Sequence, residues 1–143
     1  MERAHKVALN AKTATRDAAG AAYHWATHSV TLDRAAAGAH ATELARQVAA
    51  ADEAFAALTA RLTERQARRV AGQLATAREA LAHARATVAQ LEGEAARPEP
   101  SRSEVRALSR ELYGTLTVAV EAQQVIGKQL EPRRTMQPGP RGR

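Results

Sequence analysis

The sequence contains no cysteine, which excludes a disulfide framework, a thiolate metal site and a cysteine nucleophile. It also has no run of 18 apolar residues of the kind that crosses a membrane. Residues 1–22 carry six charged side chains and lack the apolar segment that is typical of a signal peptide. We therefore expect a soluble cytoplasmic protein without a membrane partner.

Bulky apolar residues are scarce, since Leu, Ile, Val and Phe together make only 23 of the 143 residues. Alanine, the residue with the highest helix propensity, is abundant with 36 residues. Ala, Glu, Lys, Leu and Arg together make 81 residues, a composition typical of coiled coils and long helices. The composition predicts an all-α protein whose packing is spread along extended helical contacts.

Catalytic motifs are also missing: there is no Gly-rich phosphate loop, GxSxG turn, HExxH or Glu-x-x-His pair. His24 and His28 stand four residues apart, a spacing found in zinc sites, but no nearby acid has the spacing of a third ligand. We interpret this pair as the edge of a helical interface. Glu79 and His83 have the spacing of an ordinary exposed helix pair. We expect a non-enzymatic protein without a metal or cofactor.

Apolar residues recur with alternating steps of three and four, which is the spacing of helices that pack on other helices. The first series is weak because it consists mostly of alanine, and it comprises Val7, Ala11, Ala14, Ala18, Ala21 and Trp25. The second comprises Leu44, Val48, Ala51, Phe55, Leu58 and Leu62. The third comprises Val70, Leu74, Ala77, Leu81, Ala84, Val88 and Leu91.

The second and third series are out of phase, because the eight residues from Leu62 to Val70 rotate the apolar stripe by about 80°. Thr63 and Gln66 form a capping box, so a new helix can begin there. Against this, Leu62, Thr63 and Glu64 include no Gly, Pro or Asn, and a helical hairpin normally needs a loop of about 2 to 5 residues. We favour one long central helix over about residues 34–96, with a kink near residue 63 as a possibility.

The flanking helices are expected over about residues 2–28 and 102–131, with a break near residues 29–33 and a proline-containing linker at 97–101. Asp33 is the expected N-cap of the central helix, and Ser101 with Glu104 forms a capping box for the last one. The N-terminal helix is expected to pack on the second series and the C-terminal helix on the third. Residues 1–131 then form a single, elongated, coiled-coil-like helical domain.

The net charge of +6 is concentrated in the last residues. Residues 41–96 and 97–131 are each neutral, residues 1–40 contribute +2, and the remaining +4 comes from the arginines of the tail 132–143, which we expect to be disordered. Within the helical part, the arginines are densest where the apolar stripe changes phase. Both groups are candidate nucleic-acid contacts: Arg61, Arg65, Arg68, Arg69, Arg133, Arg134, Arg141 and Arg143.

Two functional hypotheses follow from these patterns. The leading one is a helical interaction or scaffold protein that associates with itself or with another helical chain through its apolar stripes. Its candidate interface consists of Leu44, Val48, Phe55, Leu58, Leu62, Val70, Leu74, Leu81, Val88 and Leu91. The alternative is a nucleic-acid-associated accessory protein that uses the arginine-rich segments.

Overall fold

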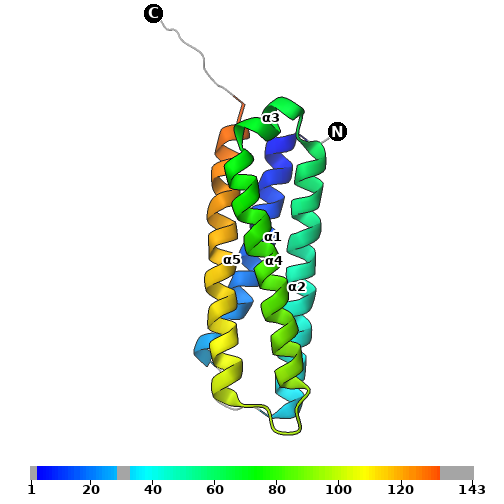
Figure 1. Cartoon of the computed structure of the whole chain (residues 1–143), viewed down its shortest axis with the longest axis vertical. Coiled ribbons are helices and arrows are strands. Elements are labelled where there is room, and N and C mark those ends of the chain that lie inside the picture. The colour runs from blue at the N-terminus through cyan, green and yellow to red at the C-terminus, as the bar shows by residue number, and fades with distance from the viewer. Residues whose placement is uncertain (1–2, 29–32, 133–143) are drawn as a thin grey trace, which may run out of the picture.

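The computed structural model describes residues 3–28 and 33–132, and these form five helices and no strand. Four helices are long: α1 (Ala4–His28), α2 (Arg34–Arg61), α4 (Ala71–Ala95) and α5 (Arg102–Leu130). The fifth, α3 (Glu64–Arg69), is short and lies between α2 and α4. The long helices lie side by side in an elongated bundle, and each runs opposite to the preceding long helix (Figure 1). The expectation of an all-α, bundle-like fold is confirmed.

The two ends of this bundle differ in construction. One end, called the α3 end below, carries α3, the first turn of α1 and the last turns of α2 and α5 (Figure 1). The other, called the loop end, carries the start of α2 and the connection from α4 to α5, within residues 33–40 and 92–106. The described chain both begins and ends at the α3 end, because Arg3 and Pro132 line one cavity there.

Short polar residues determine where the helices begin. Asp33 is the N-cap of α2, and its carboxylate accepts a hydrogen bond of 2.7 Å from the backbone N–H of Ala36. Ser101 is the N-cap of α5, and its hydroxyl accepts from the backbone N–H of Glu104 at 3.2 Å. Such caps satisfy backbone donors that have no partner within the helix. Both expected helix starts are confirmed, but the expected capping box of Ser101 and Glu104 is incomplete, because the Ser101 N–H donates to Glu94 at 2.7 Å.

The expected continuous helix over residues 34–96 is wrong. Helix α2 ends at Arg61, Leu62 adopts an extended conformation with ψ of 136°, and Thr63 begins α3 with a complete capping box. The Gln66 side chain accepts from the Thr63 N–H at 2.9 Å, and the Thr63 hydroxyl accepts from the Gln66 N–H at 3.1 Å. A turn at Val70 then leads into α4. The short helix α3 takes the place of a hairpin loop, which explains why no Gly, Pro or Asn is needed.

Because of this reversal, α2 and α4 pack against each other in opposite directions. Arg85 of α4 donates to Asp52 of α2 at 2.9 Å, and the Arg78 guanidinium lies 5.9 Å from the centre of the Phe55 ring. The change of phase between the two apolar series therefore marks two separate helices, not two faces of one helix.

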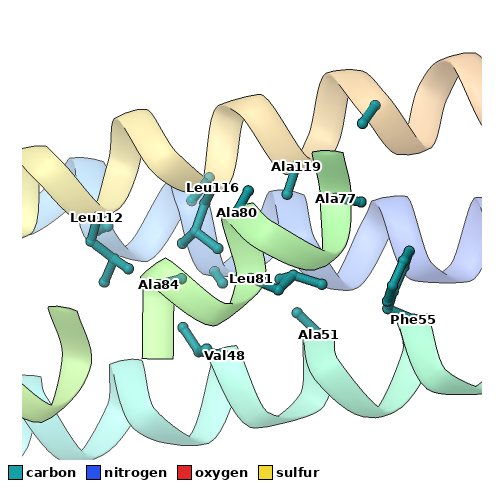
Figure 2. Close-up of a cluster of buried hydrophobic side chains, with 14 of the residues drawn as sticks. Val48, Ala51, Phe55, Ala77, Ala80, Leu81, Ala84, Leu112, Leu116 and Ala119 are labelled. Carbon is teal, nitrogen blue, oxygen red and sulfur yellow. The ribbon is translucent and has the colours of Figure 1, made fainter. Parts of the chain in front are cut away.

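The core runs along the whole bundle and combines leucines with many alanines. Figure 2 shows Val48 and Phe55 from α2, Leu81 from α4 and Leu116 from α5 pointing into one interior. Alanine buries little surface, so most of the apolar stabilisation comes from the larger side chains, at about 0.8 kcal/mol for each buried methylene. The fully buried leucines are Leu44, Leu58, Leu81, Leu91, Leu112 and Leu116.

The expected contacts of α1 with α2 and of α5 with α4 are both present. In addition, α1 packs along α5, which closes the bundle. This contact explains why α1 buries residues outside its expected series: Ala8, Thr15, Ala19, Ala22 and Ala26. Within the described residues, no helix is long and apolar enough to span a membrane. The expected disorder of residues 132–143 concerns a segment that, apart from Pro132, lies outside the described residues.

Candidate functional site

The residues predicted as a partner interface lie inside the chain. Nine of the ten are buried, with exposed fractions of at most 7%: Leu44, Val48, Phe55, Leu58, Val70, Leu74, Leu81, Val88 and Leu91. The tenth, Leu62, is half-buried against the same core. These side chains pack α1, α2, α4 and α5 together, so a partner could reach them only if the helices separated.

The arginines predicted as nucleic-acid contacts gather at the α3 end. Arg65 and Arg68 are exposed on α3, and Arg61 is exposed at the last residue of α2. Arg68 lies 3.6 Å from Glu64, and both side chains are largely exposed. Arg69 donates to the backbone oxygen of Gln129 at 3.2 Å, which ties α3 to the last turn of α5. Arg69 therefore has a structural contact with α5, while Arg65 and Arg68 are exposed and Arg68 lies beside Glu64.

The fold adds basic residues to this group that are distant in sequence. Arg3, Arg61, Gln66 and Pro132 line one cavity of about 390 Å³ at the α3 end. Residues 3, 61–70 and 128–132 together hold six basic side chains and two acidic ones, a balance of +4. The predicted contacts Arg133, Arg134, Arg141 and Arg143 lie outside the described residues, but they follow Pro132 in the sequence. The described residues of the α3 end therefore carry a net positive charge.

A second cavity, of about 190 Å³, lies beside this end between α1 and α5. Its lining includes Gln123, which is fully buried, and no described residue forms a hydrogen bond with either polar atom of the Gln123 side chain. The buried Nδ1 of His5 also lacks a partner among the described residues. Lys12 and Lys128 belong to the same lining. Both polar atoms of Gln123 are inaccessible to water, so they lie behind the wall of the cavity.

The apolar periodicity of the sequence did not identify Gln123 as a buried residue of α5. In α5, the buried positions after Leu116 are Ala119, Ala122, Gln123, Ile126 and Gly127. Val120 is only half-buried. A glutamine at a core position of a helix breaks the apolar pattern, and this break marks the cavity.

A buried histidine at the loop end forms a different polar site. The Nε2 of His40 and the hydroxyl of Ser109 are hydrogen-bonded at 3.0 Å, and the Trp25 ring centre lies 4.3 Å from the His40 ring. Burial, together with the nearby His24, lowers the pKa of His40 to about 4. Both residues of the pair are at most 2% exposed, and Nδ1 of His40 has no described partner. The pair therefore lacks the access and the orienting acid that a Ser–His nucleophile needs.

Two candidate constellations of the sequence remain, the pair His24 and His28 and the pair Glu79 and His83. The described residues contain no group of three or more His, Asp or Glu side chains that is placed to hold a metal ion. The relation of the His24 and His28 side chains lies outside what the structure describes. His83 pairs with Glu111 of α5 at 2.9 Å, and both side chains are about half exposed.

Comparisons of the chain with protein-family models, with curated proteins and with solved structures found no match.

Proposed function

We propose that this protein is a non-enzymatic interaction protein that binds a polyanion, most suitably a nucleic acid, at the α3 end. The observation that carries the proposal is the gathering of charge from four separate segments. Arg3, the arginines of residues 61–69 and Lys128 share one end, at which Pro132 leads into the arginine-rich tail. A charge of +4 at this end contrasts with −1 at the loop end, where four basic and five acidic side chains lie within residues 33–40 and 92–106.

The chemistry of this surface suits phosphate groups. Guanidinium groups hydrogen-bond phosphate oxygens and displace condensed counterions, which makes such binding strongly dependent on salt. Arg65 and Arg68 are exposed, so they can contact a ligand without a rearrangement of the bundle. The charge attracts any nucleic acid, and it does not by itself select a base sequence.

The test is a fluorescence anisotropy titration of the full chain with a labelled single-stranded DNA and with the corresponding duplex. If about four phosphates of the single strand are contacted, its affinity falls by about 50-fold between 50 and 200 mM salt. The variant R65Q/R68Q removes two of these contacts, so we expect weaker binding and a smaller dependence on salt. The variant R102Q/R110Q removes the same charge from exposed positions of α5 and serves as the matched control.

Two results would contradict the proposal. One is an affinity for both nucleic acids that does not change with salt, or no binding at all. The other is an equal loss of affinity in R65Q/R68Q and R102Q/R110Q, because this would assign the binding to overall charge and not to the α3 end.

A second candidate function, self-association or binding of a helical partner, is supported by apolar side chains that remain exposed on α1 and α5. Tyr23 and Tyr113 contact each other with ring centres 5.1 Å apart and are 50% and 37% exposed. Val118 and Val125 of α5 are 44% and 40% exposed. Size-exclusion chromatography with light scattering tests this candidate. A dimer that dissociates in Y23S/Y113S supports it, and a monomer at every concentration counts against self-association.

A further inference from the structure

A cavity of about 450 Å³ lies between α1 and α5, outside the group of basic residues at the α3 end. The lining residues that matter for its chemistry are Arg16, Gly20, Tyr23, Tyr113 and Val120. Arg16 is exposed, and Tyr23 and Tyr113 are 50% and 37% exposed, so a ligand can reach these three side chains from solvent. The volume lies within the range of roughly 300–1,000 Å³ that is typical of ligand sites.

The two tyrosines give this cavity an aromatic surface. Their ring centres lie 5.1 Å apart, with an angle of 52° between the ring planes, so the two rings contact each other across the helices. The chain has only four Phe, Trp and Tyr residues, and the other two, Phe55 and Trp25, are buried and half-buried in the bundle. Gly20 adds no side chain beside the rings, and a Cβ there would meet no neighbouring side chain within 4 Å. A flat ring of a ligand therefore has open space next to the tyrosines.

Arg16 supplies a cation beside this aromatic surface. No described residue forms a hydrogen bond or an ion pair with its exposed guanidinium. Lys12 lies one helical turn before it, and two like charges at this spacing weakly destabilise a helix. Asp17 lines the cavity on the α2 side of α1 and does not line this one. The charge of Arg16 therefore does not serve the folding of α1, and it is available to a phosphate.

A second cavity continues this surface toward the α3 end. It is the cavity of about 190 Å³ whose lining includes Lys12 and Gln124. Residues four apart on a helix are neighbours on one face. Lys12 of the second cavity is therefore next to Arg16 of the first on α1, and Gln124 is next to Val120 on α5. The two cavities together form one groove, called the α1–α5 groove below.

The α1–α5 groove is basic and leads to the proposed binding surface. Its lining includes three basic side chains and one acidic side chain: Lys12, Arg16, Lys128 and Glu131. His5 lines both this groove and the neighbouring cavity of the α3 end. The 18 residues from His5 to Tyr23 span about 27 Å along α1. This length corresponds to about eight nucleotides at a spacing of about 3.4 Å.

We propose that the α1–α5 groove binds a single-stranded nucleic acid, with its phosphates on Lys12, Arg16 and Lys128 and one of its bases stacked on the rings of Tyr23 and Tyr113. Basic grooves with aromatic side chains bind single strands in this way, because every base has a flat face that can stack. The inference rests on the proposed function and extends the same ligand from the α3 end along the bundle. It adds a preference for unpaired bases, which the arginines of the α3 end alone do not provide.

The experiment compares two labelled strands of twelve nucleotides, which is longer than the groove. One is an oligo-dA, and the other has the same sugars and phosphates without bases. The variant Y23L/Y113L removes both rings and keeps apolar side chains, so it should bind the oligo-dA about 5- to 150-fold more weakly than the wild type. Its affinity for the strand without bases should not change. Y23F/Y113F keeps the rings and is the matched control, which should bind both strands like the wild type.

A charge variant tests the path of the phosphates independently of the rings. R16Q should weaken the binding of both strands equally and lower the slope of log affinity against log salt by about 0.7, because one phosphate contact is lost. R78Q removes the same charge from an exposed position of α4 and should leave both affinities unchanged. An equal effect of R16Q and R78Q would contradict the path along α1.

NMR spectra of the tyrosine rings observe the stacking directly. The chain has only two tyrosines, so the variants Y23F and Y113F assign their ring signals. The oligo-dA should shift these signals upfield, and the strand without bases should not. Circular dichroism melting curves verify that each variant is folded, which we expect because the substituted side chains are exposed.

The outcomes separate this inference from the proposed function. If Y23L/Y113L binds both strands like the wild type, stacking on the tyrosines is wrong and polyanion binding stands. If the wild type binds neither strand, both proposals fail. If Y23F/Y113F loses as much affinity for the oligo-dA as Y23L/Y113L, the hydroxyl groups and not the rings are responsible, which overturns the inference. A wild-type dimer that Y23L/Y113L dissociates, with no change in the affinity for oligo-dA, would assign the tyrosines to self-association and also overturn it.

Discussion

The two ends of the bundle use their charged and polar side chains differently. At the loop end these groups satisfy the chain itself: the Glu94 carboxylate accepts from the Ser101 N–H at 2.7 Å and from Arg97, and Arg34 donates to the Ala96 carbonyl oxygen. The hydrogen bond from Ser101 and the pairing with Arg97 lower the pKa of Glu94. At the α3 end, Arg65 and Arg68 are instead exposed, and only Arg68 of the two lies near a carboxylate, that of Glu64 at 3.6 Å. The comparison separates charges that stabilise the fold from charges that are available to a ligand.

The largest expected effect is on the free energy of unfolding, and it differs between two leucines of the same predicted interface. Leu91, near the loop end, is 1% exposed, whereas Leu62, at the α3 end, is only half-buried. We expect L91A to lower the free energy of unfolding by about 3 kcal/mol, because it leaves a cavity in a closed core. L62A should lower it by less than half as much. Urea denaturation followed by circular dichroism measures both, and equal losses would contradict the difference in burial.

The next largest expected effect is a pH dependence of the folding stability that His40 causes at the loop end. The pKa of His40 is about 4 in the folded chain and 6.5 in the unfolded chain, so the unfolded state takes up a proton first as the pH falls. The contribution of neutral His40 to the folding stability is complete above pH 6.5 and decreases between pH 6.5 and 4. At pH 5 the loss amounts to about 2 kcal/mol relative to pH 8.

This contribution can be isolated by comparing the unfolding free energies of two variants at pH 8 and pH 5. H40L should lose the contribution, whereas H83Q, which changes an exposed histidine, should keep it. A pH dependence of H40L as steep as that of the wild type would show that other groups cause the loss.

The smallest effect concerns the two helix caps. Both hydroxyls cap a backbone N–H, but Ser101 begins the long helix α5 and Thr63 begins the six-residue α3. S101A should therefore lower the global stability by about 1 kcal/mol. T63A should mainly loosen α3, so it should weaken the proposed nucleic-acid binding while the melting temperature changes little. A larger thermal effect of T63A than of S101A would contradict this ranking.

Much of this fold could be predicted because local signals and packing agree. The caps Asp33 and Ser101 and the contacts of α1 with α2 and of α5 with α4 all follow from the sequence pattern. The reversal at Leu62 was missed because the connection is itself helical, so a stretch with high helix propensity hid a turn. The capping box at Thr63 is the correct local signal, and the absence of Gly, Pro and Asn does not exclude a reversal of the chain.

The candidate site was less predictable because it depends on contacts between distant segments. The cluster of arginines in residues 61–69 was visible in the sequence, but its proximity to Arg3 and Lys128 depends on the antiparallel order of four helices. The apolar stripes predicted as a partner interface instead pack the helices of one chain against each other. Heptad spacing shows that a helix packs on another helix, and it does not show whether that helix belongs to the same chain.

The position of the described termini has a consequence for the connectivity of the molecule. Arg3 and Pro132 line one cavity, while the α4–α5 connection with Pro98 and Pro100 lies at the opposite end. A circular permutant that joins the α3-end termini and opens the chain before Ser101 would keep every long helix whole. Its order would be α5, α1, α2 and α4, so the contact between α1 and α5 would change from the most distant in sequence to a neighbouring one.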